Sequence, residues 1–212
     1  RNPRVISISP DYPIRITAQE VPTGFDRIEA DQISRGSAPT DVDIAIIDTG
    51  VADHPDLNVF HRVDCSSVLG FCTDNSGLDD NGHGTHVAGI AAAIENDMGV
   101  IGVAPGARIW SVKVLGADGV GFLSSLIGGI DWVTGRAGEI DVANMSLTGE
   151  FSNSTFDAAI SNSVAAGITY AVGAGNDAVD AATYSPAQDP DVLTVSALAD
   201  ADGAGGGLGV FF

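Results

Sequence analysis

Residues 42–50, with the sequence VDIAIIDTG, decide the fold that we expect for this chain. The run VDIAII is almost wholly apolar and rich in β-branched side chains, which is typical of a strand buried on both faces. Similar runs recur at residues 108–115, 140–147, 168–175 and 192–198. Because helical patterns separate these runs, the sequence predicts an α/β fold, a mainly parallel, twisted sheet with helices on both faces.

Three helical patterns occupy the spaces between the strands. The first is expected to begin near His83 and to run to about residue 94. The second shows apolar side chains at the 3.6-residue period, namely Phe122, Leu126, Ile130 and Val133. The third begins with Ser154 and Asp157 in the spacing of a capping box and ends at Gly167. Between the first strand and the first helix we expect a polar, glycine-rich loop of about thirty residues.

The composition limits the class of protein and the kind of partner. The 212 residues carry 28 Asp and Glu against 9 Lys and Arg, a formal net charge of −19. At this length we expect a single main core. A surface of this charge repels nucleic acid, and no apolar run is long enough to span a membrane, so we expect neither as a partner. The acidity fits a surface tuned for solubility or an adaptation to saline surroundings.

The two cysteines lie close together in the chain. Cys65 and Cys72 enclose the segment SSVLGF in a loop rich in Gly, Ser and Asp. This spacing favours a disulfide over two free thiols, although it allows both. A disulfide would suit an oxidising, extracellular setting, so we expect a secreted protein.

Polar residues follow the strands at the edge where open α/β sheets collect their working groups. Asp48 ends the first strand, and alone it would fit an ordinary turn. His83 lies between two glycines in GHGTHVAG, where its ring gains close approach to other groups and little packing. Together they predict a carboxylate that orients an imidazole, the base half of a nucleophilic triad. Asn176 ends the run GAGN and could donate to a developing oxyanion, or it could simply form a turn.

These motifs resemble those of the subtilisin-like serine proteases. The likeness lies in AIIDTG around Asp48, NGHGTHVAGIAAA around His83, GVIGVAPGARIWSVKVL at residues 99–115, NMSL at residues 144–147, and GAGN before Asp177. It covers the chain from about residue 18 to its end. The resemblance implies a serine endopeptidase in which Asp48 orients the histidine, His83 is the general base and acid, and Asn176 binds the oxyanion.

The serine of the implied triad is the one part that we do not find. The family carries it in a Gly-Thr-Ser-Met-Ala motif, and the 212 residues contain no such motif. Ser196, in TVSAL, is expected in the middle of a strand. We therefore expect a catalytic domain truncated before the nucleophile, with its C-terminal part missing and inactive as it stands. The alternative is a short, non-catalytic module that binds peptides or a propeptide.

The resemblance also implies how a peptide or protein substrate would be held. Its backbone would lie between two segments, and the positions that match are Gly119, Val120, Gly121, Ser146, Leu147 and Thr148, with Ala174 and Gly175 in a pocket wall. Thr148 stands where the family commonly has glycine, so we expect a narrower pocket there.

A structural calcium ion (Ca2+) is implied as well, because six separate positions match a calcium site of the family. The ligands would be Gln19, Asp56, Ile94, Asn96, Met98 and Val100. Carboxylate, amide and carbonyl oxygens suit calcium, which accepts six to eight of them. The alternative is an ordinary turn containing Asn and Asp.

The resemblance extends to the start of the chain. Residues 1–17 resemble the end of an inhibitory propeptide, or else a short N-terminal extension, and residues 18–212 would be the partial catalytic domain. We expect the protein's own propeptide as a partner and a monomer at full length. A reading of His83 and His86 as metal ligands with Asp48 lacks the Glu that zinc proteases place between two such histidines.

Overall fold

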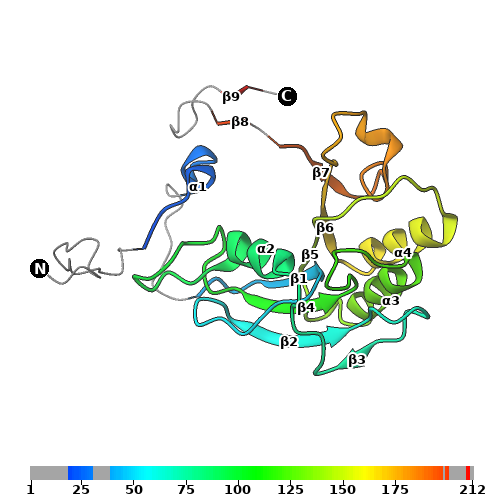
Figure 1. The fold of residues 1–212 in the computed structure, drawn as a ribbon, viewed down its shortest axis with the longest axis horizontal. Helices are drawn as coiled ribbons and strands as arrows, with labels where there is room; N and C mark the ends of the chain where they lie inside the picture. The colour runs from blue at the N-terminus through cyan, green and yellow to red at the C-terminus, as the bar shows by residue number, and fades with distance from the viewer. Residues whose placement is uncertain (1–18, 31–38, 198, 201–208, 211–212) are drawn as a thin grey trace, which may run out of the picture.

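The computed structural model describes residues 19–30, 39–197, 199–200 and 209–210, and its centre is a seven-stranded sheet (Figure 1). The strand order is β3-β2-β4-β1-β5-β6-β7. Every neighbouring pair is parallel except β2 with β3. The strands are β1 (Asp43–Asp48), β2 (Val59–Asp64), β3 (Thr73–Asp74), β4 (Arg108–Lys113), β5 (Val142–Met145), β6 (Thr169–Gly173) and β7 (Leu193–Val195).

Helices occupy the connections between the strands, so the predicted α/β class is confirmed. They are α1 (Thr23–Arg27), α2 (His83–Ala92), α3 (Leu123–Thr134), α4 (Ser154–Ala165) and the 3-10 helix η2 (Ala181–Thr183). A separate antiparallel pair joins β8 (Ala199–Asp200) to β9 (Gly209–Val210). None of the described helices is both long and apolar enough to cross a membrane. The predictions for residues 1–17 lie outside the described residues.

Alternate side chains of β1 enter two different cores. Ala45 and Ile47 pack with buried residues of α3 and α4, whereas Ile44 and Ile46 pack with Ala88 of α2. All six residues of β1 are buried. A strand in this position needs apolar side chains on both faces, which explains why the run VDIAII shows no polar and apolar alternation. The central strand thus fixes the sheet between α2 on one side and the α3 and α4 pair on the other.

The prediction of a loop between the first strand and the first helix was wrong, because this segment contains the strands β2 and β3. β2 pairs in parallel with β4, and β3 pairs with β2 in antiparallel fashion. Only Val63 of β2 is buried, and polar side chains interrupt its pattern, so the run does not look like a buried strand. His61 therefore lies in a strand rather than a surface loop, hydrogen-bonded to Asp74 at 3.0 Å and stacked on Trp132.

Two helix starts also differ from the expectation. Phe122 precedes α3 as its N-cap and is 58% exposed, so it does not belong to the buried stripe of Leu126, Ile130 and Val133. The N-cap of α4 is Asn153 rather than Ser154, since the Asn153 side chain accepts hydrogen bonds from the N–H groups of Thr155 and Phe156. An Asn side chain is as good a cap as Ser, and the sequence offered both at adjacent positions.

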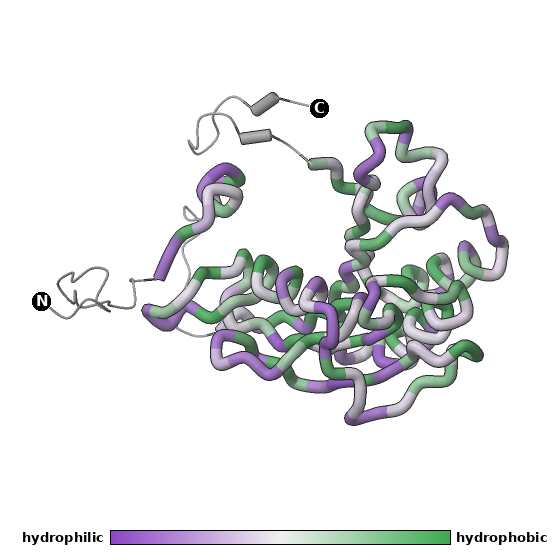
Figure 2. The backbone as a smooth tube through the Cα atoms, in the orientation of Figure 1, coloured by the Kyte–Doolittle hydropathy of each residue, from purple (hydrophilic) through white to green (hydrophobic). Residues whose placement is uncertain are grey.

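A disulfide joins Cys65 to Cys72, as the sequence favoured. Val68, Leu69 and Phe71 of the enclosed loop are exposed. Figure 2 colours the outer end of this loop as hydrophobic. Its backbone rests on α3, because the hydroxyl groups of two serines donate to its carbonyl oxygens: Ser124 to Val68 at 2.7 Å and Ser125 to Ser67 at 3.0 Å. The bridge therefore restrains a loop that supports the start of α3.

Replacing both Cys65 and Cys72 by Ser should lower stability by about 2 kcal/mol, because the unfolded chain regains the entropy of a short closed loop. Thermal unfolding of the double variant and of the unaltered protein, each with and without reductant, measures the effect. Reductant should lower the midpoint of the unaltered protein only. A variant that unfolds at the same temperature as the unaltered protein would show that the bridge contributes nothing.

Candidate active site

The candidate site lies where the carboxyl ends of the central strands meet. Asp48 is the last residue of β1 and pairs in register with Lys113, the last residue of β4. Its side chain is fully buried. Because β1 also pairs with β5 in parallel, the chain that leaves each of these strands emerges at the same edge of the sheet. This edge is where open α/β sheets bind ligands.

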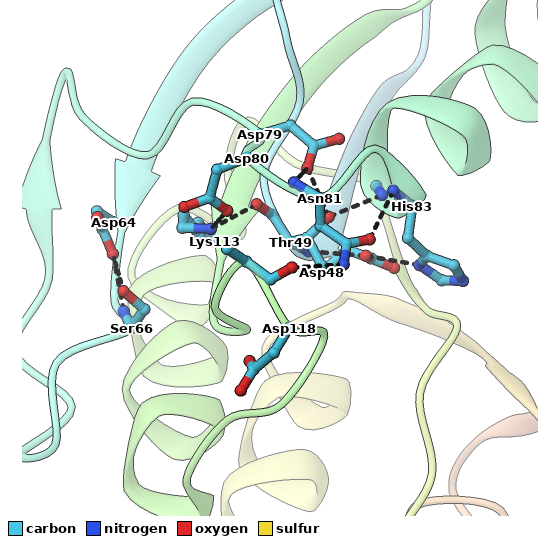
Figure 3. Close-up of polar contacts among 12 residues, drawn as sticks. Asp48, Thr49, Asp64, Ser66, Asp79, Asp80, Asn81, His83, Lys113 and Asp118 are labelled. Carbon is cyan, nitrogen blue, oxygen red and sulfur yellow. Dashed lines mark hydrogen bonds and ion pairs between the residues drawn. The ribbon is translucent and has the colours of Figure 1, made fainter.

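His83 reaches Asp48 from the first turn of α2 (Figure 3). Its Nδ1 lies 2.7 Å from Oδ1 of Asp48, although the two residues are far apart in the chain. The approach depends on Gly84, since a Cβ there would lie 2.1 Å from the carbonyl oxygen of Gly50 and 3.2 Å from Cβ of Asp48. Only a residue without a side chain allows the helix to approach the end of β1 so closely.

The hydrogen bond determines which ring nitrogen carries the proton. An ionised carboxylate can only accept, so Nδ1 of His83 donates to Asp48. The same Oδ1 also accepts from the backbone N–H of Thr49 at 2.7 Å, whereas the buried Oδ2 has no partner among the described residues. Nε2 of His83 makes no hydrogen bond to any residue that the structure describes, and the side chain is 48% exposed. The arrangement leaves an imidazole nitrogen free to accept a proton.

A cleft of about 530 Å³ adjoins the ring of His83. Six of the predicted substrate positions line it, namely Gly119, Val120, Gly121, Ser146, Leu147 and Thr148. The rest of its wall is mainly apolar, with Leu115, Phe122, Leu123, Leu126 and Phe151. Ala174 and Gly175 do not line this cleft, but a Cβ on Gly175 would lie 3.9 Å from Oγ1 of Thr148. The segments after β5 and β6 therefore lie close together beside the cleft.

Asn176 follows the end of β6 and is exposed. No hydrogen bond in the described residues joins its side chain to Asp48 or His83. Because β6 pairs in parallel with β5, and β5 with β1, the residue emerges at the same sheet edge as Asp48. Asn176 therefore emerges at the sheet edge where we expect a donor to the oxyanion.

Two polar groups that support the site, Lys113 and Asp79, were not predicted from the sequence. Lys113, the only lysine of the chain, is buried, and its ammonium group donates to the carbonyl oxygen of Thr49 at 2.8 Å and to Asp80 at 2.6 Å. Asp79 accepts several hydrogen bonds from the same region (Figure 3). Both acids precede His83 in the run LDDNGHG, so an acidic pair directly before the histidine motif was the available signal.

The residues predicted to bind calcium also come together, at the other end of α2. The amide nitrogen of Gln19 lies 2.7 Å from the carbonyl oxygen of Ile94 and 3.0 Å from that of Val100. The amide nitrogen of Asn96 lies 2.9 Å from Oδ1 of Asp56. The backbone N–H of Met98 donates to the side-chain oxygen of Asn96. These contacts form two groups, and the N–H of Ile94, which donates to the carbonyl oxygen of Asp56 at 3.0 Å, joins one group to the other.

A second cavity does not belong to this site. A larger cavity of about 850 Å³, mostly apolar, lies between α1 and α2 and contains neither Asp48 nor His83.

In the part of the chain that the structure describes, no three His, Cys, Asp or Glu side chains are grouped to hold a metal. The reading of His83 and His86 with Asp48 as metal ligands is therefore wrong.

Comparison with known proteins identifies the family. The model of the Subtilase family matches residues 40–205. Subtilisin BL of Lederbergia lenta is 41% identical over 181 residues, which are 85% of this chain and 64% of that protein. An alkaline protease of Alkalihalobacillus alcalophilus is 39% identical over 197 residues, 92% of this chain and 50% of that protein. Subtilisin E of Bacillus subtilis is 37% identical over 203 residues, 93% and 52% of the two chains.

The chain thus spans about half the length of the last two of these relatives. The aligned part holds the strand that ends at Asp48, the helix that begins at His83 and the cleft beside them. The chain belongs to the subtilase family.

Proposed function

We propose that the protein is a serine endopeptidase in which Asp48 and His83 form the base half of an Asp-His-Ser triad. The observation that carries the proposal is the 2.7 Å hydrogen bond between Nδ1 of His83 and the buried Oδ1 of Asp48, beside a cleft that can take an extended peptide. Neither residue is needed for the packing of the core, since the histidine is half exposed and the aspartate is a buried charge.

In the proposed reaction, Nε2 of His83 takes the proton from the attacking hydroxyl and later gives it to the leaving amine. Asp48 holds the proton on Nδ1 and stabilises the imidazolium that forms. The side-chain amide of Asn176 donates to the oxyanion of the tetrahedral intermediate. Each role needs only a group that the strands β1 and β6 and the helix α2 bring to one edge of the sheet.

We propose further that the attacking hydroxyl is not one of the serines in these 212 residues. Within the described residues no serine is hydrogen-bonded to His83, and Ser146, which lines the same cleft, instead accepts from the side chain of Asn144 at 3.0 Å. Residues 18–212 would then supply the base, the oxyanion donor and the substrate cleft of a catalytic domain.

The substrate would be a peptide or protein with apolar side chains near the cleaved bond. Val120 is 66% exposed and Phe122 58% exposed at the rim of a mostly apolar cleft. Apolar side chains at such positions gain affinity when a peptide covers them. The disulfide supports a secreted protein, and we propose the protein's own propeptide as a second partner and a monomeric active form.

We also propose that Ca2+ binds at the residues around Asn96. The acceptors Ile94 O, Val100 O and Asp56 Oδ1 lie 2.7 to 3.0 Å from the amide nitrogens of Gln19 and Asn96. Amide oxygen and nitrogen have the same shape, so turning the Gln19 amide over would present its oxygen where its nitrogen now lies, whereas Oδ1 of Asn96 is already fixed by the N–H of Met98. One carboxylate, two amides and several carbonyls are a donor set that suits calcium. The bound ion would neutralise Asp56 and fix the loop that follows α2.

The triad proposal predicts that His83→Ala and Asp48→Asn each lower kcat of the intact protein by at least about 10⁴-fold, because the first removes the base and the second the correct tautomer. Hydrolysis of a chromogenic peptide measures this. His61→Ala and Asp74→Asn are matched controls, since they disrupt a second His–Asp pair, 3.0 Å apart, on β2 and β3. Equal loss in the control variants would overturn the proposal.

A fluorophosphonate probe, which labels activated serines, should identify the nucleophile by peptide mass mapping. We expect one adduct in the intact protein, on a peptide outside these 212 residues, and none in the His83→Ala variant. An adduct on a serine of this sequence would show that the nucleophile has been wrongly excluded here. Cleavage that persists with no adduct would contradict a serine mechanism.

The calcium proposal predicts that a chelator lowers the unfolding temperature and that calcium restores it, with about 3 kcal/mol gained at a concentration near one hundred times the dissociation constant. Titration with calcium chloride, followed by calorimetry, measures binding directly. Asp56→Asn should abolish both effects, whereas Asp41→Asn, whose side chain is 99% exposed, should leave them unchanged. Binding to the Asp56 variant with unaltered affinity would place the ion elsewhere.

A further inference from the structure

The carboxylate of Asp79 accepts five hydrogen bonds around the start of α2. Figure 3 shows this side chain beside Thr49 and Asn81, which supply two of them. Oδ1 accepts from the hydroxyl of Thr49 at 2.8 Å and from the backbone N–H groups of Asn81 and Gly82 at 3.0 and 2.8 Å. Oδ2 accepts from the N–H and the hydroxyl of Thr85 at 3.0 and 2.5 Å. One side chain therefore binds the segment after Asp48 and both sides of His83.

The two threonine hydroxyls extend these links in both directions. The hydroxyl of Thr49, which donates to Asp79, accepts from the backbone N–H of Gly84 at 2.9 Å. The hydroxyl of Thr85, which also donates to Asp79, accepts from the N–H of Ala52 at 2.9 Å. The chain that follows β1 and the first turn of α2 are thus joined twice, and Asp79 takes part in both links.

The contacts of Asp48 and of the N-cap of α2 fix the distance between Asp48 and His83 only weakly. Asp48 has one backbone donor and the imidazole on Oδ1, and no partner for Oδ2 among the described residues. Gly82, the N-cap of α2, has φ of 106° and no side chain with which to cap the helix. Since neither residue anchors the start of α2, the position of His83 relative to Asp48 must come from other contacts.

We propose that Asp79 is a positioning residue, which sets the Nδ1–Oδ1 distance between His83 and Asp48 by tying Thr49 to the first turn of α2. The inference rests on the proposed role of the Asp48 and His83 pair. Asp79 touches neither the imidazole nor the cleft. It acts through the two threonines and through the backbone that carries His83.

The charge of Asp79 suits this role. Burial raises the pKa of its carboxyl group, but the hydrogen bonds from Gly82, Thr85 and Asn81 outweigh burial and lower the pKa to about 2. The group therefore stays ionised throughout the range in which an ordinary imidazole takes up and releases a proton. A fixed negative charge at the N-terminal end of a helix is also favourable to the helix dipole.

The test measures the hydrogen bond of His83 directly, without a nucleophile. In the intact, ¹⁵N-labelled protein, the Nδ1–H of His83 should give a low-field proton resonance that is absent from the His83→Ala variant. Asp79→Ala should make this proton exchange with water at least about tenfold faster, because five hydrogen bonds to a charged acceptor are lost. Asp79→Asn keeps one acceptor oxygen and should have a smaller effect.

The comparison includes a matched control and a milder variant. Asp64→Ala removes another aspartate, the last residue of β2, which accepts from the N–H and the hydroxyl of Ser66, and should leave the resonance unchanged. If Asp79→Ala does not fold, Thr49→Val breaks the same link with a side chain of nearly equal shape. In the intact, active protein, Asp79→Asn, which alters a residue outside the cleft, should lower kcat with little change in KM, the pattern of a misplaced base.

The outcomes separate this proposal from the triad itself. An unchanged resonance and unchanged kcat in folded Asp79→Ala and Thr49→Val would overturn the positioning role and leave the pairing of His83 with Asp48 intact. Absence of the resonance from the unaltered protein would overturn both. Faster exchange in these variants, with the Asp64→Ala control unaffected, would support the role assigned to Asp79.

Discussion

The close contact between the first turn of α2 and the turn after β1 is the constraint on which the candidate site depends. A Cβ on Gly84 would lie 2.1 Å from the carbonyl oxygen of Gly50, so any other residue there must push the helix away from the strand. A shift of 1 Å would lengthen the 2.7 Å bond between His83 and Asp48 beyond the range of a good hydrogen bond. Because Gly84 has no side chain, the helix lies close enough to the strand for the imidazole of His83 to pair with the carboxylate of Asp48.

Asp79 and Asp48 differ in how far the protein satisfies their charge. Asp79 is surrounded by five donors, and a group so fully satisfied is held in one position. Asp48 is fully buried yet leaves Oδ2 without a partner among the described residues, which is costly for an ionised group. A fold tolerates such a cost mainly at working sites, where the charge of the carboxylate stabilises an imidazolium formed during the reaction. The satisfied carboxylate suits the positioning role that we propose for Asp79, and the unsatisfied one suits the role that we propose for Asp48 beside an imidazolium.

The sequence predicted those parts of the fold that follow from local pattern. The buried run that forms β1 has one reading only, and Asp48 and His83 were paired from their motifs before their contact was known. β2 was missed because only Val63 is buried, so its sequence lacks the apolar pattern of a buried strand. Its pairing with β3 and β4 makes it a strand. Asp79 was missed for a similar reason. Its role comes from hydrogen bonds to Thr49 and Thr85, and the pattern LDDNGHG does not show which of its acids makes them.

The helix α2 explains why polar links are needed at all. Its buried residues are Gly84, Ala88 and Ala92, which bury little apolar area and so hold the helix only weakly. Small residues permit the close approach that the site needs, but they give up the packing energy that larger side chains would supply. The position of α2 must then be fixed at its ends. At the first turn Asp79 and Thr49 do this, and after the last turn Gln19 donates to the carbonyl oxygen of Ile94 and Asn96 donates to Asp56. A cation bound there would hold the far end of the helix that carries the proposed base, so binding at one end of α2 would stabilise the position of His83 at the other.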